Sequence, residues 1–237
     1  MSVSFDFEGQ TVLVTGAGGA LGSETVEAFH AAGATVHAAD VIAPSDDAYR
    51  LDPGSDGIET HVADFTDPEA VRMTVADVIE ADGRLDAVAS IAGTWRGGDP
   101  IEETDPSTVS LLFDVNVYTA FLAAKYSLPH LQESEGSIVA VASQSSLSGG
   151  AGDGPYRASK AAVRLLTESI AAENAGVVRA NAIHPDVIDT PANREMMPDA
   201  DFAEWAAPAD IADVIRFLCT DAAGPITGGS IPIGGES

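Results

Sequence analysis

Basic residues are scarce in this 237-residue chain. It contains 11 lysines and arginines against 37 aspartates and glutamates, which gives a formal net charge of -26 and a pI of about 4.1. Lys125 and Lys160 are its only lysines. Because so negative a surface repels nucleic acid and anionic lipid, we expect neither as a partner.

The acidic residues are spread along the chain rather than gathered in a tail, which indicates a solvated acidic surface. Such a surface destabilises the compact state by self-repulsion unless salt screens it, and the screening length falls to about 3 Å at 1 M salt. We interpret the charge as adaptation to a cytoplasm of very high salt, that is, as a halophilic protein. A merely acidic protein of an ordinary cytoplasm is the alternative.

The sequence also shows neither a long apolar run nor the pattern of a signal peptide. No run of about 18 apolar residues appears, so we expect no membrane-spanning segment. The first residues, MSVSFDFEGQ, contain no basic region followed by an apolar stretch, so no signal peptide is expected. The single cysteine, Cys219, lies in an apolar pattern and is typical of a small core residue in a reducing compartment. We therefore expect a cytoplasmic protein.

Short apolar runs alternate with helical patterns along the whole chain, and the length suits one α/β domain spanning residues 1–237. The runs predict strands at 10–15, 33–40, 58–63, 85–91, 137–142, 177–183 and 226–233. Helices are predicted at 23–32, 69–81, 106–133 (interrupted near Pro129), 156–175 and 208–218. This alternation predicts a Rossmann-like doubly wound parallel sheet of about seven strands, with ligands bound where the strands end.

The first predicted strand ends at a glycine-rich turn, and a helix follows. The sequence of the turn is GAGGALG, and its candidate dinucleotide-binding residues are Gly16, Gly18, Gly19, Ala20, Leu21 and Gly22. Glycines let the backbone approach a pyrophosphate, and the helix N-terminus offers free N–H groups and the positive end of a dipole. A tight structural turn is the alternative for this motif taken alone.

A carboxylate ends the second predicted strand, at Asp40. An acidic side chain there can bind the ribose hydroxyls of an adenosine and repel a 2′-phosphate. No arginine or lysine lies in the glycine turn or directly after Asp40. The sequence therefore favours NAD over NADP as the cofactor.

The stretch from Ser143 to Lys160 combines a hydroxyl, a phenol and an ammonium. Ser143 follows the fifth predicted strand, and Tyr156 and Lys160 are four residues apart, on one face of the predicted helix. A hydroxyl at a strand end, opposite such a pair, can act on a carbonyl or an alcohol. The stretch therefore indicates a catalytic site rather than a core.

Together these residues resemble the classical short-chain dehydrogenase/reductase family over nearly the whole chain. The matching positions are Thr15, Gly16, Ala20, Gly22, Asp64, Ala92, Gly93, Asn116, Ser143, Tyr156, Lys160, Asn181, Pro185 and Thr190. A Tyr-x-x-x-Lys motif is common by chance. Here it comes with an upstream serine, a glycine turn near the N-terminus and strands at suitable intervals, so the joint pattern is specific.

The resemblance implies a role for each matching residue. Tyr156 is expected to be the general acid/base, with Lys160 and the positive nicotinamide lowering its pKa from about 10. Ser143 is expected to hydrogen-bond the substrate oxygen, and Asn116 to position a water that relays protons through Lys160. Cofactor contacts are expected from Asp64, Ala92, Gly93, Pro185, Ile188 and Thr190, besides the glycine turn, Asp40, Tyr156 and Lys160. The family also implies a homodimer or homotetramer.

Some positions depart from the family pattern. Ser90 and Ile91 replace two asparagines, which puts the hydrogen bonding at that strand end in doubt. Asp186 replaces a glycine, and we expect its carboxylate to point to solvent rather than into the nicotinamide pocket. No metal site is predicted, because His184 has no second histidine or cysteine at ligand spacing.

The predicted substrate loop, at about 186–207, contains the pattern T-P-x-N-R-x-x-M-P-x-A-D at 190–201, with Trp205 beyond. This pattern resembles the corresponding loop of the dihydropteridine reductases, which are NADH-using members of the same superfamily. In those enzymes the serine position is typically not serine, whereas Ser143 is present here. Arg194 is either a cation facing the substrate or part of an ion pair that closes the loop.

We therefore predict an NAD(H)-dependent oxidoreductase that interconverts an alcohol and a carbonyl. A dihydropteridine reductase-like enzyme is the alternative within the same fold. A non-catalytic dinucleotide-sensing protein is the alternative from another class.

Overall fold

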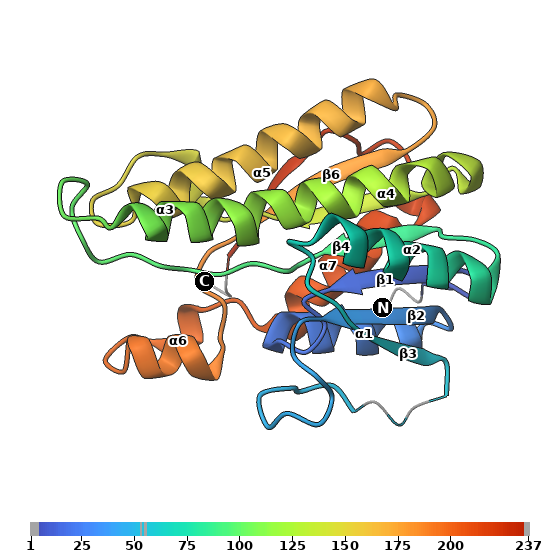
Figure 1. Cartoon of the computed structure of the whole chain (residues 1–237), viewed down its shortest axis with the longest axis horizontal. Helices are drawn as coiled ribbons and strands as arrows, with labels where there is room; N and C mark the ends of the chain where they lie inside the picture. The colour runs from blue at the N-terminus through green and yellow to red at the C-terminus, as the bar shows by residue number, and fades with distance from the viewer. Residues whose placement is uncertain (1–4, 53, 55, 235–237) are drawn as a thin grey trace.

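The computed structural model describes residues 5–52, 54 and 56–234, and its centre is a seven-stranded parallel sheet (Figure 1). The strand order is β3-β2-β1-β4-β5-β6-β7. The strands are β1 (Thr11–Thr15), β2 (Thr35–Asp40), β3 (Ile58–Val62), β4 (Ala87–Ser90), β5 (Ser137–Val141), β6 (Arg179–Pro185) and β7 (Ser230–Ile233). The order runs outward in both directions from β1 and β4, which confirms the predicted doubly wound fold.

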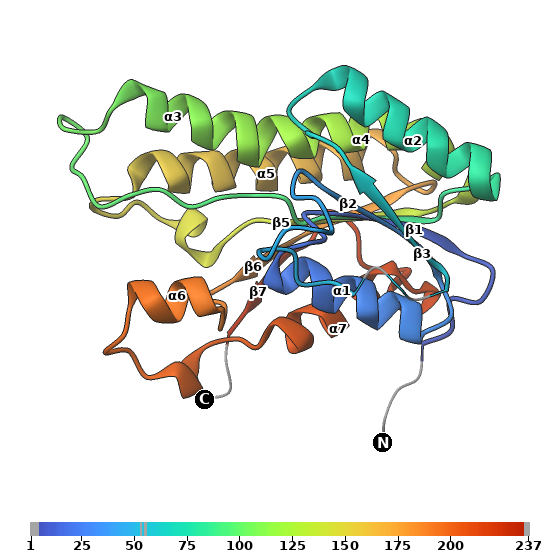
Figure 2. The ribbon, with the colours of Figure 1, turned by 60° about the horizontal axis from the view of Figure 1, so that its bottom comes forward.

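Helices cover both faces of the sheet (Figure 2). On one face, α1 (Ala20–Ala31) and α7 (Pro208–Cys219) pack against each other. The other face is covered by α2 (Pro68–Asp82), α4 (Thr119–Ser134) and α5 (Gly154–Glu173). Side chains alternate along β1: Val12 and Val14 enter the core under α1, while Leu13 enters the core under α2 and α4. Both faces are buried, which explains why the strands read as continuous apolar runs.

The long helical pattern is irregular at a different place from the one predicted. A π-helical turn, Phe113–Tyr118, joins α3 (Pro106–Leu112) to α4. Pro129, where we expected the interruption, lies inside α4. A proline costs one helical hydrogen bond, which α4 tolerates without a break. The wide turn instead falls at Asn116, as π-bulges often do at functional sites.

The last strand is shorter than predicted because Asn181 organises the residues before it. The Asn181 side chain donates to the carbonyl of Ile226 at 2.9 Å and accepts from the N–H of Gly229 at 3.0 Å. These bonds, with a left-handed Gly228 (φ 68°), make residues 226–229 a turn. Pairing with β6 then begins only at Ser230.

The helical stretch Pro106–Ser134 is long and apolar enough, by length and composition, to cross a membrane. Core helices of ordinary α/β domains pass the same test. Here the buried side of α4 packs on the sheet through Leu122 and Leu131. This packing accounts for the apolar composition of the stretch.

Candidate active site

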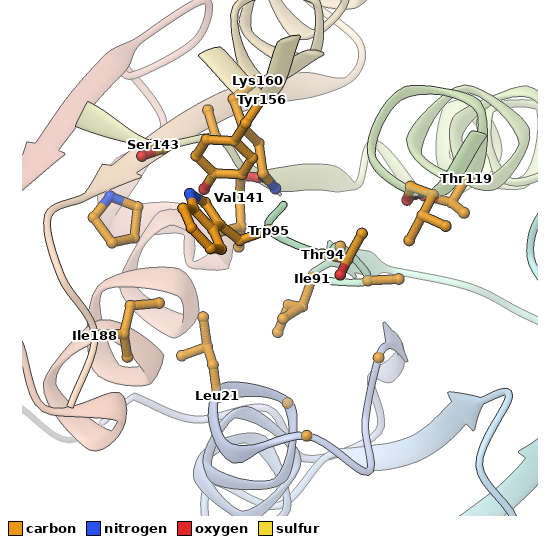
Figure 3. Close-up of a pocket in the computed structure, with 18 of the residues that line it drawn as sticks. Leu21, Ile91, Thr94, Trp95, Thr119, Val141, Ser143, Tyr156, Lys160 and Ile188 are labelled. Carbon is orange, nitrogen blue, oxygen red and sulfur yellow. Dashed lines mark hydrogen bonds between the residues drawn. The ribbon is translucent and has the colours of Figure 1, made fainter. Parts of the chain in front are cut away.

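A cavity of about 990 Å³ opens where the strands end (Figure 3). It brings together most of the residues that the sequence indicated. Its lining includes Gly16, Gly19, Leu21, Gly22, Asp40, Asp64, Ala92, Gly93, Ser143, Tyr156, Lys160, Pro185 and Ile188. Among the described residues, the predicted site positions outside this lining are Gly18, Ala20, Asn116 and Thr190.

At two positions of the glycine turn, neighbouring backbone atoms leave no room for a side chain. Gly16 has a φ of 69°, and a Cβ there would lie 2.9 Å from the backbone of Ala92. A Cβ on Gly22 would overlap the Gly16 carbonyl oxygen. These glycines therefore let α1 approach β1 closely and keep the turn open toward the cavity.

The N-terminus of α1 is open to a ligand. Its N-cap residue is Gly19, and no side chain in the described part of the chain caps it. By contrast, Asp67 caps α2 and Asp105 caps α3. The first N–H groups of a helix lack partners within the helix. Those of α1 are therefore available to an anion such as a pyrophosphate.

Asp40 is fixed at the end of β2 by two backbone bonds. Its Oδ2 accepts from the N–H of Gly18 at 2.8 Å, and its Oδ1 accepts from that of Ile42 at 2.9 Å. The side chain is 8% exposed and lines the cavity. The carboxylate thus stands beside the glycine turn and faces the cavity.

The segment after β2 adds two residues that sequence reasoning missed. The ring of Tyr49 packs where a Cβ of Gly18 would lie, and burial together with the Asp40 charge raises the pKa of its phenol. The N–H of Arg50 donates to the Gly18 carbonyl at 3.0 Å. An arginine therefore lies next to the turn, although the sequence places it ten positions after Asp40. No local motif signals this fold-back.

Lys160 is buried on α5 and tied to β5. It is 5% exposed, and its Nζ donates to the carbonyl of Val141 at 2.8 Å. Burial lowers its pKa to about 8. Tyr156 is one turn earlier on the same helix face, and its side chain projects into the cavity, as Trp95 does (Figure 3).

The pKa of Tyr156 shifts in the direction opposite to the one expected from its neighbour Lys160. Burial raises it above its ordinary value of 10.0, and the charge of Asp153 raises it further. A hydrogen bond with the Ser143 side chain acts in the opposite direction and lowers it. The chain's own groups therefore keep this phenol protonated at neutral pH, and Lys160, bonded to a carbonyl, does not counter the desolvation.

Ser143 caps a short 3₁₀ turn, Gln144–Leu147, directly after β5. Its hydroxyl lies 2.9 Å from that of Ser145. The backbone is held by His184, whose Nδ1 is 3.0 Å from the Ser143 carbonyl and whose Nε2 is 2.8 Å from the Ser230 hydroxyl. His184 thus fastens the Ser143 segment to β7.

Asn116 uses its side-chain amide to hold the segment after β4. Its Oδ1 accepts from the N–H of Thr94 at 2.7 Å, and its Nδ2 donates to the Thr94 carbonyl at 3.0 Å and to the Ser159 hydroxyl at 2.9 Å. A Cβ on Gly93 would lie 3.0 Å from both Asn116 Oδ1 and Lys160 Nζ. The three residues are therefore in close contact.

The strand end at which Ser90 and Ile91 replace two asparagines is held by Thr15. Its hydroxyl accepts from the N–H of Ile91 at 3.1 Å and from that of Ala92 at 3.2 Å. A side chain of β1 thus holds the end of β4.

The substrate loop differs in part from expectation. Arg194 pairs with both oxygens of Asp189, at 2.5 and 2.6 Å, and lies over the ring of Phe202. Arg194 thus forms an ion pair within the loop, and in the described chain it is not among the residues that line the cavity. The Thr190 hydroxyl accepts from the N–H of Asn193 and caps α6 (Pro191–Met196), outside the cavity lining in the described chain.

The loop contributes an apolar wall to the cavity through Met196 and Met197. The rings of Phe202 and Trp205 pack against each other at a tilt of 54°, with centroids 4.8 Å apart. Neither residue is in the cavity lining of the described chain. Asp186 is exposed, as expected, although it also reaches the cavity rim.

Comparisons with known proteins identify the family of the chain. The family model described as enoyl-(acyl carrier protein) reductase matches residues 16–235. The chain belongs to the short-chain dehydrogenase/reductase family, a family of oxidoreductases.

Individual relatives differ in substrate. The chain is 30% identical to a meso-2,3-butanediol dehydrogenase of Serratia marcescens, over 97% of this chain and 94% of that protein. It is 27% identical to a dihydropteridine reductase of Dictyostelium discoideum, over 94% of this chain and 93% of that protein. A 3-ketoacyl-(acyl-carrier-protein) reductase from Brucella melitensis, solved with NADH, superposes with a TM-score of 0.85 at 25% identity. That match covers 96% of this chain and 98% of the other.

Proposed function

We propose that this protein transfers a hydride between NAD(H) and a small alcohol or carbonyl compound. The observation that carries the proposal is the cavity itself. The Ser143 hydroxyl, the Tyr156 phenol and the Lys160 ammonium line one wall, and the glycine turn with the open end of α1 lines the opposite one. A dinucleotide laid along the strand ends reaches both.

The residues present fit a dinucleotide. The open N-terminus of α1 would hold the pyrophosphate, Asp40 the adenosine ribose, and Asp64 the adenine side. Lys160 would bind the second ribose, while the backbone near Pro185 and Ile188 would hold the carboxamide. When bound, the nicotinamide supplies the hydride acceptor or donor and, when oxidised, a positive charge near Tyr156.

Tyr156 moves the proton at the substrate oxygen, and Ser143 holds that oxygen by a hydrogen bond. The protonated phenol that the buried site favours is the form needed to reduce a carbonyl, because it donates a proton as the alkoxide develops. For alcohol oxidation the phenolate is needed, and the cofactor's positive charge favours it. Lys160, which has a pKa of about 8, and a water held near Asn116 would carry the proton onward.

Asp40 supports NAD over NADP. Its buried carboxylate stands where a 2′-phosphate would come, and like charges repel. Arg50, beside the glycine turn, favours the opposite preference. We place more weight on Asp40, because its side chain lines the cavity and Arg50 reaches the turn only through its backbone.

A dihydropteridine reductase-like activity is the second candidate, because a curated relative carries that name and the substrate loops are similar. A quinonoid pterin needs little polarisation of a carbonyl. The Ser143 hydroxyl on the cavity wall therefore favours an ordinary carbonyl or alcohol substrate.

The experiment that separates these readings follows NADH and NADPH oxidation with a panel of small carbonyl compounds and a quinonoid pterin in concentrated KCl. We expect turnover of at least one carbonyl with NADH. Turnover of the pterin alone would favour the second candidate. Saturable NADH binding without turnover across the panel would favour a dinucleotide sensor.

We also propose a homodimer or homotetramer in a salt-rich cytoplasm. Exposed apolar side chains on α4, α5 and the π-helical turn, among them Phe113, Tyr118, Phe121 and Leu165, suit burial against a second copy. The charge of -26 requires screening. Light scattering measures the oligomeric state. Salt adaptation is tested by comparing unfolding at about 0.1 M and about 2 M KCl, and equal stability at both concentrations would contradict it.

A further inference from the structure

Three side chains with metal-ligating atoms meet near the β3 edge of the sheet. His37 lies on β2, and Glu59 and His61 lie on β3. The parallel register sets Glu59 opposite His37 and His61 opposite Ala39, so all three side chains stand on the same face. Their ligating atoms all lie within 4.8 Å of one another. Within the described chain, none of the three lines the cavity.

His37 is held in the form that a metal ion requires. The side chain is fully buried, and its Nε2 lies 3.0 Å from Asp82 Oδ2. That carboxylate oxygen also accepts from the Thr11 hydroxyl at 2.9 Å. A carboxylate at Nε2 keeps the proton there and leaves the lone pair on Nδ1. The same arrangement orients and strengthens histidine ligands in zinc sites.

The distances are close to those of a tetrahedral site. His37 Nδ1 lies 2.8 Å from His61 Nε2 and 3.8 Å from Glu59 Oε2. Zinc bonds of about 2.0–2.2 Å set ligand atoms about 3.3–3.5 Å apart. Side-chain shifts of about half an ångström would bring these two distances to that value. The ligand atoms of His61 and Glu59 lie within 4.8 Å of each other.

The site is open to solvent on one side. The Glu59 side chain is 55% exposed and His61 is half-buried, so an ion can enter and water can complete the coordination.

We propose that His37 Nδ1, His61 Nε2 and the Glu59 carboxylate bind one zinc-like divalent cation, with Asp82 as the positioning residue for His37. The spacing of histidines and cysteines along the chain gives no sign of this site. The pairing of β2 with β3 brings together residues that are 24 positions apart. The ion would clamp the edge strand β3 to β2, the strand that carries Asp40. The alternative is a hydrogen bond between the two histidines that binds no ion.

The test is a titration of the full chain, without an affinity tag, with Zn²⁺ alone and with Co²⁺ as a spectroscopic probe. Concentrated KCl suppresses loose binding to the acidic surface. We expect one ion per chain and a visible Co²⁺ spectrum of a tetrahedral site. Asp82→Asn should weaken binding about 10- to 100-fold. His61→Gln should weaken it more. His130→Gln, a histidine change on α4, is the matched control and should leave binding unchanged.

The effect of Zn²⁺ on the thermal unfolding midpoint provides a second test. Zn²⁺ should raise the unfolding midpoint of the wild type and of His130→Gln but not that of His61→Gln. If His61→Gln fails to fold, Glu59→Gln, at an exposed position, takes its place and should also weaken binding. Two results would overturn the proposal. One is equal binding by the wild type and the ligand variants, which would show that the ion binds only to surface carboxylates. The other is the absence of saturable binding by the wild type.

Discussion

The residues proposed for catalysis and the substrate loop are built differently. We call Asn116, Ser143, Tyr156 and Lys160 the catalytic floor; the last three line the cavity, and Asn116 lies behind them. The floor comes from a helix turn, a strand end and a long helix packed on the sheet. Asn116 and Lys160 are 1% and 5% exposed and bonded to backbone atoms of neighbouring segments. The substrate loop, 186–207, has no buried residue in its short helices α6 and η3 (Phe202–Glu204). Under the proposed function, we infer from this difference that the floor sets the chemistry and the loop selects the substrate.

The largest expected effect is on the floor. Tyr156→Phe removes the proton donor and should lower kcat by about 10²- to 10⁴-fold, the usual contribution of a general acid. NADH affinity should stay near the wild-type value. Tyr126→Phe on α4 is the matched control. Steady-state kinetics and a fluorescence titration give the two numbers, and a variant that keeps wild-type kcat would contradict the assignment.

Burial of Lys160 has a cost that depends on pH. The pKa of this side chain is about 8 in the folded protein, against 10.5 for a free lysine. Between these values the unfolded chain binds more protons, so stability rises with pH; below pH 8 the full penalty remains. Relative to Lys160→Met, the wild type should therefore gain at most about 3 kcal/mol in unfolding free energy across this window. Denaturant titrations at several pH values measure the difference in unfolding free energy between the wild type and Lys160→Met. A difference that is constant with pH would contradict the lowered pKa of Lys160.

Asp40 belongs neither to the catalytic floor nor to the substrate loop. It lies beside the glycine turn and lines the cavity. Asp40→Ala removes a charged hydrogen-bond acceptor, so the NADH affinity should fall about 10- to 100-fold. The preference for NADH over NADPH should narrow. Arg50→Ala is the counterpart and should weaken NADPH binding alone. An unchanged NADH/NADPH ratio in Asp40→Ala would remove the argument for NAD.

The smallest effect belongs to the loop. Arg194 and Asp189 form an exposed pair, so Arg194→Gln should raise KM by at most about fivefold and leave kcat unchanged. A large fall in kcat would mean that Arg194 faces the substrate after all.

The sequence could predict the features that follow from local patterns, but not those that depend on contacts between distant segments. The glycine turn, Asp40, Ser143 and the Tyr156–Lys160 pair follow from strand ends and helix periodicity, which are local patterns. The bonds of Asn116 to Thr94 and Ser159, and the contact of Tyr49 with Gly18, join segments that no local pattern relates. The π-helical turn was also missed, because the apolar periodicity runs through it while Pro129 gives the stronger local signal.

The most direct test of the division between floor and loop is one panel of carbonyl compounds assayed with NADH for the wild type, Tyr156→Phe and Met197→Ala. The account predicts that Tyr156→Phe lowers kcat/KM for every compound by a similar factor. Met197→Ala should instead change the order of preference while the best substrate still turns over. Tyr156→Phe activity at the wild-type level with any compound, or a uniform loss in Met197→Ala, would contradict it.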